Sequence, residues 1–443
     1  MGFSQALSGV NAASQQLDVI GNNISNSQTK GFKSGSVQFS DVFANSAVGL
    51  GTRVSGILQD FSSGSLEATG RNLDIAIAGD GFLRFQQEGQ VGYSRNGQLT
   101  MTADGYLENA QGARLMGYGL ADATDVNSGV VTGGQPGVLN IPAADMPASA
   151  TGATGTGINI LLNLDGATVA DDTSTATLYN DLTAKNGEDT TNQTSIAYNY
   201  STSFTVYDSQ GAQHNATLYF QKTGENTWVA RTALDGVLTA DSLGSVADPA
   251  TAEAPLRLTF DNSGKLATIN GEATTANPVT WPDLTFTANE LGTGVEEINA
   301  TFNMAGSTQF AGDSTVKSLA QDGYAAGALV GISFADDGTI VGNYSNEKTV
   351  DLGQIALATF RNPEGLTPSG DNLFAATAAS GNELLGIAGT GTLGSIESET
   401  LEASNVDLTQ ELVNLIIAQR NYQANTNSIR TQSEVMDQIA QLR

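Results

Sequence analysis

The stretch that decides the fold is the C-terminal end of the chain, residues 401–443, which reads LEASNVDLTQELVNLIIAQRNYQANTNSIRTQSEVMDQIAQLR. It contains neither proline nor glycine, so a continuous helix can form there. Its seam positions follow one another in alternating steps of four and three residues, and they are Leu408, Leu412, Leu415, Gln419, Tyr422, Thr426, Ile429, Ser433, Met436 and Ala440. We predict a helix on the order of 50 Å long, capped by Ser404 or Asn405.

A second amphipathic helix is expected at the N-terminus. Its apolar stripe consists of Phe3, Leu7, Val10, Leu17, Ile20 and Ile24. Gly21 costs about 1 kcal/mol within a helix and marks a weak point or the end. Packing against the chain's own core is the ordinary role of such stripes. Polar seam residues such as Gln419 and Ser433, and the lack of an adjoining bundle, instead favour helices that become ordered on self-association.

We therefore predict a self-assembly surface on the two terminal helices. Its residues are Leu7, Val10, Leu17, Ile20, Ile24, Leu408, Leu412, Leu415, Tyr422, Ile429 and Met436.

The chain between the helices has β character. Short apolar runs such as Phe82 to Phe85 and Val91 to Ser94 are separated by Glu88-Gly89 and similar pairs, which favour tight hairpin turns. Residues 324–398 show the same pattern of short apolar runs separated by turn-forming pairs. All nine prolines lie between Pro136 and Pro368. The fold class is mainly β and multidomain, with nested β-rich domains and terminal helices that form a coiled-coil-like inner domain.

Charge separates the centre of the chain from the rest. Residues 121–315 contain 22 acidic and 5 basic residues, which gives seventeen of the twenty-eight net negative charges. Such an excess suits a solvated outer surface. The net charge of -28 repels phosphate backbones and anionic lipids, so nucleic acid and membrane surfaces are not expected as partners. No apolar run reaches the length of a membrane span.

Composition and motifs argue against an enzyme, a metal site or a cofactor. The chain has no cysteine and one histidine, which excludes thiol chemistry and structural zinc. The glycine-rich run from Gly389 to Gly394 has no surrounding βαβ unit, so we interpret it as a loop. His214 has no nucleophile motif to serve and is expected on a surface hairpin. No spacing indicates a pair of catalytic carboxylates, and the calcium-like turn at Asp336 lacks a complete ligand loop.

The two ends of the chain resemble the terminal signatures of bacterial flagellar axial proteins. The segments that carry this resemblance are 8–12, 17–26, 29–32, 404–408, 411–413 and 418–424. Further blocks at 71–77, 81–82, 93–97, 341–346, 352–355 and 362–366 resemble the hook-forming members of this family. In the centre only 205–211 matches well. Distal-rod proteins share the ends but are much shorter.

The resemblance implies a structural subunit of an extracellular helical polymer that joins the flagellar rod to the filament, bends continuously and transmits torque as a universal joint. It implies an inner tube domain from 1–30 and 400–443, an extended connector at 31–70 and a β-rich middle domain from 71–145 and 316–399. The acidic outer domain, 146–315, could be one domain or hold a sub-insertion.

The resemblance also implies partners and a route of export. The partners are further copies of the chain, the distal rod protein, the hook–filament junction protein, the hook cap and the type III export apparatus. Export without a cleaved signal peptide agrees with an N-terminus that lacks a basic and an apolar region. Phe39 and Phe43 are similar to an export-gate motif, although two phenylalanines four residues apart are commonly a packing pair.

Two other functions fit less well. A distal rod or other axial protein would share the terminal helices. A secreted β-rich adhesin or surface-layer protein would share the composition, but it has no need for a heptad helix at a terminus.

Overall fold

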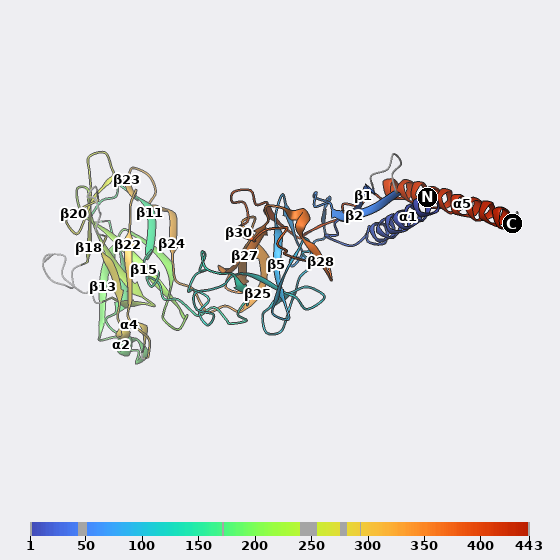
Figure 1. Ribbon diagram of the computed structural model, residues 1–443. Coiled ribbons are helices and arrows are strands. Elements are labelled where there is room, and N and C mark those ends of the chain that lie inside the picture. The colour runs from blue at the N-terminus through green and yellow to red at the C-terminus, as the bar shows by residue number, and fades with distance from the viewer. Residues whose placement is uncertain are drawn as a thin grey trace. The chain divides into compact units, whose positions relative to one another are not determined.

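The computed structural model describes residues 2–42, 51–170, 172–239, 255–274, 281–292 and 294–441. The chain divides into two compact units (Figure 1): unit 1 comprises 1–144 and 329–443, and unit 2 comprises 145–328. Unit 2 is therefore an insertion within unit 1. The chain returns to unit 1 at 328/329, later than the change at 315/316 expected from the sequence, because β24 (Thr315–Gln321) pairs antiparallel with β11 (Ile158–Asp165) in unit 2.

Both predicted terminal helices are present in unit 1. Helix α1 spans Gly2–Ser25 and α5 spans Leu408–Gln441. Helix α1 continues through Gly21, so this glycine does not end it. The predicted cap of α5 was wrong. The carboxylate of Asp407 accepts the backbone N–H groups of Thr409 and Gln410, whereas Asn405 is engaged with segments distant in the sequence.

A hairpin packs on the side of α1. Strands β1 (Gly35–Val42) and β2 (Gly51–Gln59) pair antiparallel with a bulge at Gln38 and Phe39. The amide of Asn23 fixes the start of the hairpin, because it donates to the carbonyl of Gly35 and accepts its N–H, both at 2.9 Å. Strand β3 (Leu66–Ala68) then pairs with β32 (Thr400–Glu402) immediately before α5. Segment 31–70, expected to be an extended connector, is thus largely strand in its described part.

The β body of unit 1 is a mixed set of antiparallel hairpins from both flanking segments. Eight strands of its 12-stranded sheet follow one another in the order β25-β26-β27-β9-β5-β6-β29-β28, and four short strands pair beside this path. The strands of the path are β25 (Leu329–Phe334), β26 (Thr339–Tyr344), β27 (Thr349–Thr359), β9 (Arg114–Tyr118), β5 (Phe82–Gln87), β6 (Gln90–Ser94), β29 (Leu373–Ala375) and β28 (Thr367–Gly370).

Short strands and one 3-10 turn complete this body: β4 (Ile75–Ala78), β7 (Thr100–Met101), β8 (Leu107–Glu108), β10 (Gly137–Val138), β30 (Leu384–Ile387), β31 (Ser395–Ser398) and η1 (Pro363–Gly365). A buried aromatic cluster of Phe82, Tyr93, Phe360 and Phe374 packs edge to face in its core. Glu88 and Gly89 both have positive φ, 50° and 81°, as the predicted tight turn between β5 and β6 requires.

Unit 2 has two sheets that share one hydrophobic core around Trp228, Phe220, Phe286 and Phe302. The five-stranded sheet contains β11, β21 (Asp283–Phe286), β22 (Ile298–Asn303), β23 (Thr308–Phe310) and β24. The nine-stranded sheet contains β12 (Ser174–Tyr179), β13 (Gln193–Tyr198), β14 (Tyr200–Tyr207), β15 (Gln213–Gly224), β16 (Thr227–Leu234), β17 (Val237–Leu238), β18 (Leu256–Phe260), β19 (Leu266–Ile269) and β20 (Glu272–Ala273). Two short helices, α2 (Leu182–Asn186) and α4 (Ala288–Leu291), accompany them.

The two ends of unit 2 are held together by one carboxylate. Asp322 accepts the N–H of Gly152 at 2.7 Å, the hydroxyl of Thr154 at 2.6 Å and the N–H of Gly157 at 3.0 Å. Partial burial raises the pKa of Asp322, but these hydrogen bonds outweigh it and the pKa is lowered overall. The ionised form of Asp322 therefore stabilises unit 2.

We predict that Asp322→Asn destabilises unit 2 by about 1–2 kcal/mol at pH 7, because charge-assisted bonds are lost and one N–H faces an amide donor. Because the folded-state pKa is lowered, this stability is present above the unfolded pKa of about 3.9 and is lost as pH falls through the folded value. Urea unfolding followed by tryptophan fluorescence measures it, since Trp228 and Trp281 both lie in unit 2. Asp283→Asn is the control, because Asp283 is exposed and the Asn carbonyl can still accept the hydrogen bond from the Thr301 hydroxyl. If the free energies of unfolding of wild type and Asp322→Asn differ as much at pH 3 as at pH 7, the ionised Asp322 carboxylate is not what stabilises unit 2.

Candidate self-assembly surface

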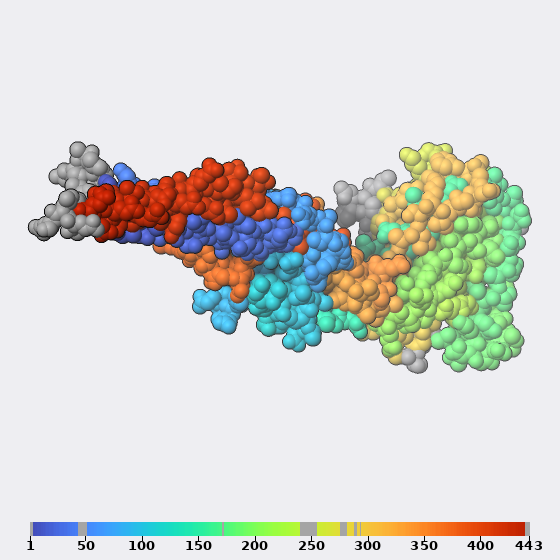
Figure 2. All heavy atoms as spheres, turned by 90° about the vertical axis from the view of Figure 1, so that its right-hand side faces the viewer, coloured from blue at the N-terminus to red at the C-terminus, as the bar shows by residue number. Residues whose placement is uncertain are grey.

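Helices α1 and α5 pack against each other antiparallel, side by side in Figure 2. Small residues form the contact: Ala6 and Ala13 of α1 and Ala418 of α5 are buried. A Cβ atom at Gly9 would lie 2.7 Å from the side chain of Asn425, so Asn425 occupies the space that a side chain at position 9 would need. The helix pair is therefore held by close contact of small residues rather than by a broad leucine seam.

The predicted assembly residues divide into three groups. Ile20 is buried in the helix pair. Val10, Leu17, Ile24, Leu415 and Ile429 are half-buried. Leu7, Leu408, Leu412, Tyr422 and Met436 are exposed. The predicted seam of α5 is thus rotated from the face that contacts α1, on which Ala418 and Asn425 lie. Sequence reasoning missed Ala6, Gly9, Ala13 and Ala418, although small residues at helical spacing could have indicated them.

Five apolar side chains on the first turns of α5 form an exposed surface, which we call the outer arc. Its members are Leu408, Leu412, Val413, Ile416 and Ile417, each between 43% and 51% exposed. They lie away from Ala418, whose side faces α1. This arrangement stabilises a monomer little, because about half of each of these residues remains in water.

Among the described residues, no helix packs against the end of α5. Helix α5 has 34 residues and α1 has 24, and Figure 1 shows α5 continuing past the first residues of α1. Met436 there is 67% exposed. An isolated helical end is marginal in water, so this end also requires a neighbour for stability.

The helix pair carries little charge for a chain of net charge -28. Helix α1 has a single charged residue, Asp18, and residues 412–429 of α5 have only Arg420. Many copies of such helices can be crowded together with little repulsion between like charges.

The tentative export motif is described in part. Phe39 lies in β1, with 44% of its surface exposed, whereas Phe43 lies outside the described residues.

A buried cluster of three charges joins the base of the helix pair to the β body. The Nζ of Lys33 lies 2.6 Å from Glu402 Oε1, and the Nη1 of Arg95 lies 3.3 Å from Glu402 Oε2. Lys33 also donates to the carbonyl of Ser62 at 2.6 Å, and Gly64 N–H donates to Glu402. Burial lowers the pKa of Lys33 and of Arg95, and the Glu402 carboxylate opposes both shifts. One carboxylate thus connects segments that are far apart in the sequence.

The single histidine, His214, lies on the β14–β15 hairpin as predicted, but its side chain is more enclosed than a surface position implies. Its side chain is 12% exposed, with Nδ1 at 2.8 Å from Asp235 and Nε2 at 3.4 Å from Asp208. The imidazole therefore links two turns of unit 2. Within the described residues, no group of three His, Asp or Glu side chains is arranged to hold a metal ion.

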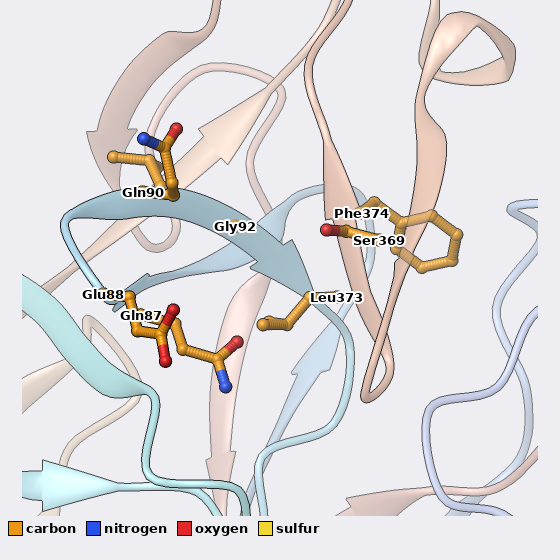
Figure 3. A pocket seen from close by; sticks show the side chains of 8 residues that line it. Gln87, Glu88, Gln90, Gly92, Ser369, Leu373 and Phe374 are labelled. Atoms are coloured by element: carbon orange, nitrogen blue, oxygen red, sulfur yellow. The ribbon is translucent and has the colours of Figure 1, made fainter.

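A hollow with a volume of about 520 Å³ lies on the β body of unit 1, and Figure 3 shows the side chains that line it. Gln87, Glu88 and Gln90 lie at the β5–β6 turn, and Ser369, Leu373 and Phe374 come from the β28–β29 hairpin. Glu88 is the only ionisable residue in its lining, so this hollow presents no acid–base pair. No helix in the described ranges has the length and apolar character that crossing a bilayer requires.

Four family models match consecutive parts of the chain. They are described as Flagella basal body rod protein (residues 4–33), Flagellar hook protein FlgE/F/G D1 domain (76–171), Flagellar basal body protein FlaE D2 domain (174–324) and Flagellar basal body rod FlgEFG protein C-terminal (397–442).

Relatives match over the full length. The flagellar hook protein FlgE of Escherichia coli (strain K12) is 43% identical, and that of Salmonella typhimurium (strain LT2) is 42% identical, each over 100% of both chains. The crystal structure of Helicobacter pylori flagellar hook protein FlgE2 overlaps 76% of this chain and 100% of its own, with a TM-score of 0.49 and 13% identity. The full-length identity decides the assignment: the chain belongs to the flagellar hook protein family and is a structural subunit of the bacterial flagellar hook.

Proposed function

We propose that the chain polymerises into a curved tube through its terminal helices, and that this tube acts as a flexible universal joint transmitting torque from rod to filament. The observation that carries the proposal is the outer arc of α5, an apolar surface that the chain itself leaves uncovered. Burying it against neighbouring copies contributes about 25 cal/mol for each Å² of apolar surface removed from water. A contact between unlike surfaces that does not close on itself produces a filament rather than a ring.

The parts of the subunit take different places in this proposal. Residues 1–30 and 400–443 form the inner tube, and segment 31–70 connects it to the β body. The β body of unit 1 forms a middle shell. Unit 2, which contains most of the acidic excess, forms the outer shell, because like charges are least costly in contact with solvent.

The proposed partners follow from the position of a hook subunit. They are further copies of the chain, the distal rod protein, the hook–filament junction protein, the hook cap and the type III export apparatus. The assembled subunit is extracellular. We propose that it is exported unfolded without a cleaved signal peptide and that Phe39 and Phe43 engage the export gate.

Assembly of the purified chain tests the function. We expect tubes in electron micrographs when the protein is concentrated, and restored hooks when the chain is expressed in a strain that lacks its own hook subunit. A chain that remains monomeric and restores no hooks would overturn the proposal.

Excision of unit 2 tests the assignment of shells. We predict that replacing 145–328 with a short Gly/Ser linker leaves tube formation intact but changes the curvature of the tubes. The linker can be short because Met146 and Gly327 form a β-bridge that holds the two ends together. Micrographs of intact and shortened chains give the comparison. Unchanged curvature would remove unit 2 from the bending mechanism, and loss of tubes would place it at an essential interface.

A further inference from the structure

A groove lies where the C-terminal half of α1 meets the base of the β1–β2 hairpin. Its volume is about 280 Å³, and Val19, Phe32 and Ile57 provide its apolar walls. Asp18 and Gln59 provide polar groups in the same lining. The groove lies wholly within unit 1 and adjoins the helix pair.

Two polar groups of this groove, on Gln59 and Asp18, have acceptor oxygens that remain available, whereas the amide of Asn23 is already bonded to Gly35. The Oε1 atom of Gln59 is buried and has no hydrogen-bond partner. Asp18 is exposed, and no ion pair of the described residues includes it. A buried carbonyl oxygen without a donor costs about 1–3 kcal/mol, so the groove is incomplete in the isolated chain. A carboxylate beside an amide oxygen fits a ligand with several N–H donors and a positive charge.

Arg420 of α5 has this chemistry. Its guanidinium carries five donors in a fixed fork. It is exposed, and no carboxylate of the described residues lies within ion-pair distance of it. The other basic residues of the helices and of segment 26–34 are engaged: Lys30 pairs with Glu67, Lys33 with Glu402 and Arg430 with Glu434. Arg53 donates to the hydroxyl of Ser40.

Arg420 cannot reach Asp18 of its own chain. It follows Ala418 by two residues, which places it about 200° around α5 from the contact with α1. Asp18 follows Ala13 by five residues, about 140° around α1 from the same contact. Both side chains therefore point away from the helix pair, and their pairing requires a second copy.

We propose that Arg420 of one copy binds in the Asp18–Gln59 groove of the next copy, a contact that rests on the proposed self-assembly. The guanidinium donates to the Asp18 carboxylate and to Gln59 Oε1, and its methylene stem packs against Val19 and Ile57. Each copy contributes its groove to one neighbour and its arginine to another, so the contact repeats without closing. Asp18 is the one charged residue of α1 and Arg420 is the one charged residue between Glu411 and Arg430 of α5, so their attraction also fixes the register between copies.

Charge reversal tests the pairing. Arg420→Glu and Asp18→Arg should each raise the protein concentration needed for tubes by about thirtyfold or more, because one charge of a desolvated pair then meets its like. The double variant should recover most of the loss, since the Gln59 amide can turn its NH₂ group towards a glutamate. Arg430→Glu is the matched control, because Arg430 is equally exposed but already pairs with Glu434. Circular dichroism checks that each monomer is folded.

Cross-linking gives a second measurement that keeps both charges in place. The chain has no cysteine, so Asn22→Cys in the groove and Gln423→Cys beside Arg420 introduce the only thiols. In tubes of this double-cysteine variant, a short bismaleimide should join copies into a ladder of dimers, trimers and longer species. Single-thiol variants should give dimers at most.

The outcomes separate this proposal from the proposed function. If wild-type protein forms tubes, normal tubes from Arg420→Glu, or tubes of the double-cysteine variant that give no ladder, would overturn the pairing while leaving the hook assignment intact. A wild-type chain that forms no tubes would overturn the function itself. If a charge-reversed monomer is unfolded, the ladder alone decides.

Discussion

A single aspartate at Ile416 is expected to abolish polymerisation while the monomer remains folded. Ile416 belongs to the outer arc and is 51% exposed, on the side of α5 that faces away from α1. In the monomer the new carboxylate stays in water, so the cost is limited to a small loss of helix propensity, at most about 0.7 kcal/mol. In the tube it must be desolvated without a partner at every repeated interface, which costs several kcal/mol each time.

Sedimentation and electron microscopy of the Ile416→Asp variant measure this effect, with circular dichroism as a check on the monomer. Ile416→Val is the matched control, because it keeps the apolar surface, and it should form tubes normally. Leu415→Asp is a weaker test, since Leu415 is half-buried within the monomer and its loss would also disturb the helix pair. Tubes of normal length from Ile416→Asp would show that the outer arc faces solvent in the hook.

The terminal helices illustrate what local sequence determines. Absence of proline and glycine and a sustained heptad are enough to predict α5, because helix formation depends on neighbouring residues. The face that contacts α1 could not be predicted from apolar periodicity. The contact uses Gly9, Ala13 and Ala418, whose advantage is small size rather than apolar area. The apolar stripe is left for other contacts.

The β hairpins show the same contrast between features that local sequence predicts and features that depend on long-range contacts. Glu88-Gly89 predicts a tight turn because positive φ is a local requirement, and the turn is present. The return of the chain to unit 1 was expected before β24, but this strand pairs with β11, more than 140 residues earlier in the chain. Composition changes gradually along 315–328, so it carries no signal for a partner chosen by long-range pairing.

The Lys33–Glu402–Arg95 cluster could not be predicted from the sequence. Lys33 and Glu402 are separated by 369 positions, and neither has a local motif that indicates burial. Charged residues are almost never fully buried unless paired, and no local pattern around these three residues indicates a partner. The fold brings them together because β3 and β32 pair directly beside the start of β1.

Glu402→Gln is accordingly predicted to destabilise unit 1 by about 3–5 kcal/mol, since it leaves two buried cations facing a neutral amide. Hydrogen exchange of peptides covering 75–101 and 396–407 measures the loss where it occurs, because both tryptophans lie in unit 2 and do not report on unit 1. Glu67→Gln is the matched control: it removes the partner of Lys30 in an exposed pair and should cost at most about 1 kcal/mol.

A triple variant distinguishes the stability that the three-charge cluster contributes from the cost of removing only one of its charges. Replacing Lys33 and Arg95 with methionine and Glu402 with leucine removes all three charges and keeps an apolar volume at each position. Burial of ions costs so much desolvation that such a replacement is often neutral or stabilising. We expect the triple variant to regain much of the stability that Glu402→Gln loses. If it is as unstable as the single variant, the hydrogen bonds that Lys33 donates to the Ser62 carbonyl and that Glu402 accepts from Gly64 N–H, rather than charge balance, hold the helix pair to the β body.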